Sequence, residues 1–351
     1  MSPTFVLHNS PIFLGPLAET FPFWLENQQY SQVFVLCDAN TRRHCLPYFL
    51  KETGLSEKII LSEIQSGESE KTLATCEKIW QSMLAAKLDR KALVVNLGGG
   101  VIGDMGGFCA ATWKRGVDFI QVPTTLLSMT DAAIGGKTGI DFQGIKNTIG
   151  VFQQPVAVFV DPVFLQTLPE RELRSGYAEV IKHALIGDSE LTDSLTLSET
   201  ISQLNGLAIL QKSIAVKVRV VQEDPLEKGL RMLLNFGHSI GHALESWFLE
   251  TEDPLTHGEA IYIGMVCESF LAGNESLQKA VLKLGQQIFS HRNMGPGIYP
   301  AIWEMMLHDK KNSSGTVRIA VPDEYPFSLK IIEPAQSDVE RSLAYYNTTA
   351  I

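Results

Sequence analysis

The sequence predicts an α/β fold for the first half of the chain and a mainly helical second half. Between residues 33 and 160, apolar runs of strand length alternate with segments of helical periodicity. After about residue 161, long helical segments follow one another. A chain of 351 residues is long enough for two domains. We therefore expect an α/β N-terminal domain over residues 1–161 and a mainly α-helical C-terminal domain over residues 162–351.

In the first half, short runs rich in β-branched residues predict strands of a mainly parallel sheet. The predicted strands cover residues 33–37, 58–61, 92–97, 118–122 and 156–160. The run at 92–97 is predominantly apolar, as expected for a strand buried on both faces. Helical segments over 68–87 and about 103–113 lie between strands, and this alternation is typical of an α/β layer.

The second half shows helical spacing almost throughout. We predict the helices over residues 169–186, 190–221, 236–249 and 258–271, with one late strand over 316–321.

Composition narrows the class of protein. The formal net charge of −10 argues against nucleic acid as a partner. The 5 cysteines are odd in number and form no CxxC pair, which favours reduced thiols in the cytoplasm. The first residues lack the basic start and apolar run of a signal peptide. The most apolar later stretch, residues 260–273, is too short to span a bilayer, so we expect no membrane partner.

A glycine cluster follows the predicted strand at 92–97. Residues 98–103 read G-G-G-V-I-G and match G-x-G-x-x-G between a strand and a helix. Glycine lets the backbone approach a pyrophosphate, and helix N-terminal N–H groups attract the anion. A tight structural turn would explain the cluster equally well. No acid ends the next strand to hold a ribose, although Asp38 could do so. The pattern predicts nucleotide binding without a standard dinucleotide unit.

The helical half carries a group of candidate metal ligands. His238 and His242 share one helix face, and Glu179 and His183 have the same i, i+4 spacing. His257 stands at a predicted helix start. Two imidazoles and a carboxylate suit Zn²⁺ with an open position for substrate. Taken singly, each of these histidines is better explained as a surface or hydrogen-bonded core side chain, and only the group as a whole indicates a metal site.

Several cationic and amide side chains lie in glycine-rich or apolar segments. Converging groups of this kind would suit a substrate that carries phosphate and carboxylate. Solvated surface lysines are the alternative, and the better explanation for Lys212 and Lys228. The candidates are Lys137, Lys146, Asn147, Lys182, Lys217, Arg231 and Asn235.

Together these segments resemble the 3-dehydroquinate synthases, a family of sugar-phosphate cyclases. The resemblance runs in family order from about residue 38 to residue 311. The matching runs are residues 66–71, 98–104, 123–127, 131–139, 146–147, 164–167, 176–183, 234–242 and 257–259. Residues 105–107 and 113–114 depart from the family pattern beside the nucleotide helix.

The resemblance implies an NAD-binding N-terminal domain, a metal- and substrate-binding C-terminal domain, and an active site between them. It implies Glu179, His238 and His257 as ligands of one divalent metal, zinc or alternatively cobalt, and moves His242 to the substrate side. The implied NAD contacts are Asp38, Asn40, Glu68, Lys71, Gly99, Gly100, Val101, Ile102, Gly103, Asp104, Thr124, Thr125, Lys137, Lys146, Phe164, Thr167, Leu168 and Glu172.

The resemblance also implies catalytic and substrate-binding residues. These are Asp131, Lys137, Lys146, Asn147, Lys182, Lys217, Glu227, Arg231, Asn235 and His242. Arg115 would reach a neighbouring subunit's site, which implies a homodimer. One further family lysine corresponds to Lys310 or Lys311, and both alternatives remain open.

The implied activity converts a small sugar-acid phosphate, 3-deoxy-D-arabino-heptulosonate 7-phosphate, to 3-dehydroquinate and phosphate in the shikimate pathway of aromatic amino acid biosynthesis. The steps would be transient oxidation by NAD, phosphate elimination, reduction and an intramolecular aldol. One alternative is a cyclase acting on sedoheptulose 7-phosphate, and another is a metal-dependent polyol dehydrogenase. A non-enzymatic NAD- or metal-sensing protein is a third.

Overall fold

The computed structural model describes residues 2–55, 59–143, 145–197, 206–249, 251–307 and 316–349. The chain forms two compact units. The first comprises Met1–Pro169 with Asn205–Val218, and the second comprises Glu170–Leu204 with Arg219–Ile351. Lys58, Lys310 and Lys311 lie outside the described residues. The domain boundary expected after residue 161 stays a prediction. So does the expectation that the first domain binds NAD and the second binds the metal and the substrate.

A seven-stranded sheet forms the centre of the first unit, in the order β1-β2-β9-β6-β5-β3-β4. Its strands are β1 (Phe5–Leu7), β2 (Ser10–Leu14), β3 (Val33–Asp38), β4 (Ile59–Ile64), β5 (Leu93–Gly98), β6 (Asp118–Pro123) and β9 (Ala157–Val160). All neighbouring pairs are parallel except the hairpin β1–β2. The strands from β3 to β9 follow the doubly wound order 2-1-3-4-5, which changes direction between β3 and β5.

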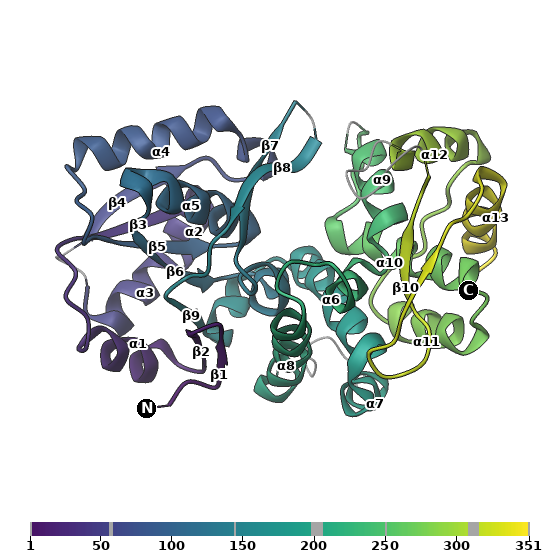
Figure 1. Cartoon of the computed structure of the whole chain (residues 1–351), viewed down its shortest axis with the longest axis horizontal. Helices are drawn as coiled ribbons and strands as arrows, with labels where there is room; N and C mark the ends of the chain where they lie inside the picture. Colours follow the sequence, from purple (N-terminus) through teal and green to yellow (C-terminus); the bar gives the residue numbers. More distant parts are fainter. Residues whose placement is uncertain are drawn as a thin grey trace. The chain divides into compact units, whose positions relative to one another are not determined.

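Helices cover both faces of this sheet (Figure 1). They are α1 (Leu17–Leu25), α2 (Ala39–His44), α3 (Leu46–Thr53), α4 (Leu73–Ala85) and α5 (Gly100–Thr112). The buried side chains Ile79 and Met83 of α4 and Met105 of α5 pack with Phe34 and Val94 of the strands in one apolar core. Burying both faces of the sheet explains why its central strands read as apolar runs in the sequence.

The unusual glycines at 106 and 107 have a structural explanation. A Cβ on Gly106 would lie 2.0 Å from Oδ1 of the buried Asn96 on β5. A Cβ on Gly107 would lie 2.5 Å from the side chain of Thr138. Since neither space admits a methyl group, α5 packs against its neighbours directly through its backbone.

A two-stranded antiparallel hairpin also belongs to the first unit. It consists of β7 (Lys137–Phe142) and β8 (Ile145–Phe152), and the sequence did not predict it. Most of β8 is exposed, including Ile145 and Phe152, so the strand lacks the apolar alternation that indicates a half-buried strand.

The second unit is built from helices. They are α6 (Glu170–Gly187), α7 (Ser189–Leu197), the end of α8 (Leu207–Glu223), α9 (His238–Phe248), α10 (His257–Leu271), α11 (Glu275–Gly285), α12 (Tyr299–Leu307) and α13 (Gln336–Asn347). A hairpin of β10 (Ile319–Pro322) and β11 (Leu329–Ile332) completes it. Residues on all sides of α10 are buried, because α6, α9, α11 and α13 surround it.

The predicted fold class is confirmed, and one predicted helix was wrong. The described parts of the segment 190–221 belong to two helices, α7 and α8, and Gly206 forms a bend immediately before α8 that the helical spacing did not indicate. The helix expected over 68–87 begins only at Leu73, after a single turn over Glu68–Glu70. In the part of the chain that the structure describes, no helix has the length and apolar character needed to cross a membrane.

Candidate active site

The glycine cluster lies at the carboxyl edge of the sheet, where the strand order changes direction. Thr124, which follows β6, donates its backbone N–H to the Gly98 carbonyl oxygen at 3.0 Å. A Cβ on Gly99 would lie 3.0 Å from Cγ2 of Thr125. The amino-terminal end of α5 thus begins directly beside these threonines. In doubly wound sheets, ligands bind at this edge, and helix N-termini favour anions there.

Asp38 ends β3 at the same edge and caps the next helix. Its Oδ1 accepts hydrogen bonds from Thr41 N at 2.8 Å and from Thr41 Oγ1 at 3.0 Å. The predicted ribose acceptor therefore has a structural role at the start of α2, and its contact with NAD stays a prediction. Nearby, Asn40 donates its backbone N–H to Ser66 Oγ at 3.3 Å.

Lys71 is the centre of a polar cluster beside the glycine turn. Its side chain is 5% exposed, and Nζ lies 2.7 Å from Asp104 Oδ2 and 2.6 Å from Asn147 Oδ1. Burial would lower the pKa of Lys71, but the charges of Asp104 and Glu68 outweigh burial and raise it. Lys146 Nζ lies 3.6 Å from Glu68 Oε1. The structure thus brings together five residues that were predicted to contact cofactor or substrate.

Asp131 and Lys217 form a second polar pair in the first unit. Lys217 Nζ, on α8, lies 2.7 Å from Asp131 Oδ1, on the short helical turn η3 (Ser128–Ala132). The Lys217 side chain is almost fully buried, whereas Lys137, at the start of β7, is exposed. Residues 86 positions apart in the sequence therefore meet in one ion pair.

Other residues of the predicted NAD set follow β9 in the sequence. Phe164, in the turn η4 (Pro162–Thr167), is buried against the ring of Tyr48. Burial raises the pKa of the Cys45 thiol to about 11, against the lowering effect of hydrogen bonds to Thr167 and Thr124. Cys45 therefore contacts two predicted NAD residues. Leu168 is half-buried, and Glu172 lies exposed on α6 in the second unit.

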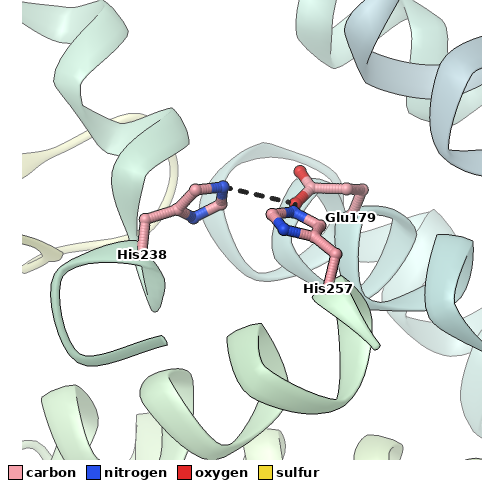
Figure 2. Close-up of side chains that lie close together, drawn as sticks. All are labelled: Glu179, His238 and His257. Carbon is pink, nitrogen blue, oxygen red and sulfur yellow. Dashed lines mark ion pairs between the residues drawn. The ribbon is translucent and has the colours of Figure 1, made fainter. Parts of the chain in front are cut away.

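The three predicted metal ligands meet within the second unit (Figure 2). The Nε2 atoms of His238 and His257 lie 3.5 Å and 3.6 Å from Glu179 Oε1. The Glu179 side chain is 1% exposed. A carboxylate withdrawn from water needs positive partners. Two imidazole nitrogens and a carboxylate oxygen directed at one point form a donor set that fits Zn²⁺ or a similar divalent cation.

Local sequence explains where the two histidines stand. Thr256 and Glu259 form a capping box, so α10 begins at His257. Gly237 adopts a left-handed conformation with φ of 83°, so α9 begins at His238. Each histidine is thus the first residue of its helix.

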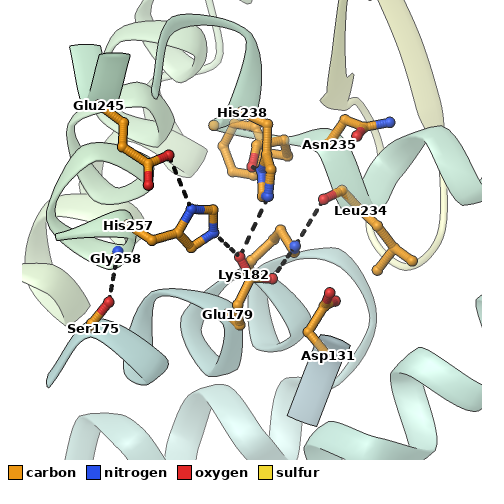
Figure 3. A network of polar contacts seen from close by, with 12 residues as sticks. Asp131, Ser175, Glu179, Lys182, Leu234, Asn235, His238, Glu245, His257 and Gly258 are labelled. Carbon is orange, nitrogen blue, oxygen red and sulfur yellow. Dashed lines mark hydrogen bonds and ion pairs between the residues drawn. The ribbon is translucent and has the colours of Figure 1, made fainter. Parts of the chain in front are cut away.

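Close helix contacts hold these two helix starts in place. Gly258 donates its backbone N–H to Ser175 Oγ on α6 at 2.9 Å (Figure 3). A Cβ on Gly264 of α10 would lie 1.9 Å from the Gly237 carbonyl oxygen. The helices that carry the three candidate ligands therefore pack against one another with little space between them.

The His257 imidazole lies between two carboxylates. Burial lowers its pKa, but the adjacent carboxylates of Glu179 and Glu245 outweigh burial and raise the pKa to about 9. A cation bound at this point would take the place of the proton, since metal ligands must be deprotonated.

Lys182 and the remaining histidines lie beside this group. Lys182 is buried and donates to Glu179 and, at 2.7 Å, to the Leu234 carbonyl oxygen. The ring of His242 is 5.0 Å from that of His238, measured between centroids. His183 is fully buried in α6 and is outside the trio of Glu179, His238 and His257.

A loop before α9 carries three predicted substrate residues. Asn235 Nδ2 donates to Glu227 Oε1 at 2.8 Å, and the buried Arg231 donates to the Pro225 carbonyl oxygen at 2.7 Å. Asp224 organises this loop by accepting backbone N–H bonds from Lys228, Gly229 and Arg231. In the first unit, the predicted intersubunit residue Arg115 is exposed and has a φ of 68°.

Comparison with known proteins identifies the family of this chain. The family model described as 3-dehydroquinate synthase N-terminal matches residues 61–175, and the 3-dehydroquinate synthase C-terminal model matches residues 176–312. A 3-dehydroquinate synthase of Parabacteroides distasonis is 40% identical over 308 residues, covering 85% of this chain and 86% of the relative. The chain belongs to the 3-dehydroquinate synthase family.

Two further proteins are similar to this member of the 3-dehydroquinate synthase family. A 3-dehydroquinate synthase of Synechocystis is 44% identical over 271 residues, covering 74% of each protein. A solved 2-epi-5-epi-valiolone synthase from Streptomyces hygroscopicus, with NAD⁺ and Zn²⁺ bound, is 27% identical with a TM-score of 0.83, covering 97% of each chain.

Sequence reasoning missed Glu245, Glu268 and Cys45. Glu245 touches His257, Glu268 binds the backbone at the start of α9, and Cys45 lies beside Thr124 and Thr167. Glu245 follows His238 by seven residues, so helical spacing could have placed it on the same face. No local signal distinguishes Glu268 or Cys45, because their partners are distant in the sequence.

Proposed function

We propose that this protein is a 3-dehydroquinate synthase, which converts 3-deoxy-D-arabino-heptulosonate 7-phosphate to 3-dehydroquinate and phosphate. One observation carries the proposal: a member of this family directs two imidazole nitrogens and a buried carboxylate at a single point. Identities of 40% and 44% to 3-dehydroquinate synthases support this activity over that of the valiolone synthase at 27%.

Glu179, His238 and His257 would hold the divalent cation, for which we propose zinc. The turn at Gly99–Asp104, with Thr124 and Thr125, would hold the phosphates of NAD. When bound, the cation would supply positive charge that stabilises an ionised substrate hydroxyl, and NAD would supply a transient hydride acceptor.

The chain's own side chains would bind and orient the substrate. Cationic groups among them would hold its phosphate and carboxylate, as lysine and arginine do in charge-assisted hydrogen bonds. His242 would carry protons between the substrate and its surroundings. The proposed set is Asp131, Lys137, Lys146, Asn147, Lys182, Lys217, Glu227, Arg231, Asn235 and His242.

The decisive experiment supplies the seven-carbon sugar-acid phosphate with NAD and a divalent cation. We expect phosphate and dehydroquinate in equal amounts with no accumulation of NADH, because NAD is regenerated in each turnover. A polyol dehydrogenase would accumulate NADH with a simple polyol instead. Phosphate release from sedoheptulose 7-phosphate alone would assign the chain to the other cyclases. No turnover of any of these substrates by NAD- and cation-loaded protein would contradict an enzymatic role.

We also propose that the protein works in the cytoplasm as a homodimer. The five cysteines are free and buried, which suits a reducing compartment. The exposed Arg115 would extend to the partner's active site. Sedimentation equilibrium tests the dimer. Mixing Arg115→Ala chains with chains inactivated at another site should restore activity if the arginine acts across subunits.

A further inference from the structure

His257 is held between two carboxylates that bind opposite sides of its ring (Figure 3). Its Nε2 lies 3.6 Å from Glu179 Oε1, and its Nδ1 lies 3.4 Å from Glu245 Oε2. Glu245 is on α9, and its side chain is only 10% exposed. No step of the proposed reaction requires Glu245, so its burial beside His257 needs its own explanation.

The other imidazole shows the same arrangement. His238 Nδ1 lies 3.2 Å from the carbonyl oxygen of Phe236, and its Nε2 lies 3.5 Å from Glu179 Oε1. A carbonyl oxygen can only accept, so Nδ1 of a neutral His238 carries the proton and leaves the lone pair on Nε2. An ionised Glu245 likewise only accepts, and it selects the same tautomer for a neutral His257. In both rings, Nε2 is then the nitrogen with the lone pair that can bind a cation.

We propose that Glu245 is a positioning residue of the cation site, fixing the orientation and tautomer of His257 so that Nε2 binds the ion. This inference rests on the proposed cation site. Outer carboxylates commonly hold metal-binding histidines in this way. Because His238 begins α9 and Glu245 lies two turns further along, a single helix supplies one ligand and orients the other.

A second explanation for Glu245 makes a different prediction. One donor atom from each of His242, Glu245 and His257 lies within 4.8 Å of the others, so this trio could hold a second cation. The positioning role requires one ion per chain, whereas a second site requires two. Stoichiometry therefore separates the two explanations.

The test measures Co²⁺ binding to chelator-treated protein, through the visible absorption of the bound ion and competition with a chromophoric chelator. We expect one Co²⁺ per chain in the unaltered protein. Glu245→Ala should weaken Co²⁺ affinity about 10- to 100-fold. Glu245→Gln should recover part of the affinity, because its amide oxygen can still accept from Nδ1. Glu304→Ala, an exposed carboxylate on α12, is the matched control and should bind as the unaltered protein does.

Several outcomes would overturn the inference. Unchanged Co²⁺ affinity in Glu245→Ala would remove the positioning role while leaving the cation site intact. Two ions per chain, with the second lost in Glu245→Gln, would assign Glu245 as a ligand instead. If the unaltered protein bound no Co²⁺, the cation site itself would fail. If Glu245→Ala does not fold, the Co²⁺ affinity and stoichiometry of Glu245→Gln test the inference instead. A purely structural role of Glu245 predicts that the folded Glu245→Gln variant binds Co²⁺ with unchanged affinity.

Discussion

Glu268 holds the beginning of α9 through Gly237. The buried carboxylate accepts a hydrogen bond from the Gly237 backbone N–H at 2.6 Å, and a second from Ile240 N at 3.1 Å. The first N–H groups of a helix have no intrahelical partners. A negative charge at this end also interacts favourably with the positive end of the helix dipole. Glu268 lies near the carboxyl end of α10, so it ties the helix of His257 to the helix of His238.

Replacing Glu268 with glutamine should lower the stability of the protein. The amide keeps the shape, but it loses the charge and turns an NH₂ group toward one backbone donor. We expect a loss of about 2 kcal/mol, as for hydrogen bonds to buried charged groups. Urea unfolding at neutral pH measures this loss. The exposed Glu304→Gln on α12 is the control and should be neutral, and equal stability of both variants would argue against the cap.

Adding one methyl group at Gly106 should disturb the first unit. The new Cβ would lie 2.0 Å from Asn96 Oδ1 and 2.9 Å from Leu36 Cδ2. We expect Gly106→Ala to destabilise by about 1–3 kcal/mol through overpacking, measured by thermal unfolding. Gly295→Ala, where a Cβ meets nothing within 4 Å, serves as control. Adding Asn96→Ala to Gly106→Ala should recover stability, and no recovery would contradict the steric explanation.

Removing the carboxylate of Glu179 should abolish cation binding and catalysis together. Two neutral imidazoles remain, so affinity should fall more than about 100-fold, beyond the loss typical of outer-sphere changes. Metal content after dialysis and the rate of phosphate release are the measurements. Glu170→Ala, on the exposed beginning of the same helix, should retain both. Full activity of metal-free Glu179→Ala would contradict the assignment.

Asp224 should contribute stability that depends on pH. Partial burial raises the pKa of Asp224, but three backbone N–H bonds from Lys228, Gly229 and Arg231 outweigh it and lower the pKa. A lowered folded-state pKa stabilises above the unfolded value, near 3.9, and the contribution disappears as pH falls through the folded-state pKa. Asp224→Asn should therefore be less stable than the unaltered protein at pH 7, and the difference should shrink toward pH 3. Unfolding free energies at several pH values test this, and a constant difference would contradict it.

The sequence predicted those elements whose signal is local. The strands at 33–37, 92–97, 118–122 and 156–160 correspond to β3, β5, β6 and β9, because strands buried on both faces are strongly apolar. The antiparallel hairpins β1–β2 and β7–β8 were missed, since their strands are short or exposed and lack a periodic pattern.

The candidate site was partly predictable for the same reason. Helical spacing indicated Glu179 and His238, and the predicted helix start indicated His257. Spacing favoured His183 and His242 equally, and only the resemblance separated them. The arrangement of Glu179 against His238 and His257 depends on contacts between three helices, and no window of sequence contains these contacts. The role of Glu268 was not predictable from the sequence, because a carboxylate in an apolar helix does not indicate which backbone groups it will bind.

At the contact between Gly264 and the Gly237 carbonyl, the backbone of α10 packs directly on the residue that precedes α9, with no space for a side chain between them. A shift of either helix at this contact would therefore displace the imidazole that begins the other. Substitutions that shift α9 or α10, even far from the proposed cation site, should therefore change the metal affinity before they unfold the unit.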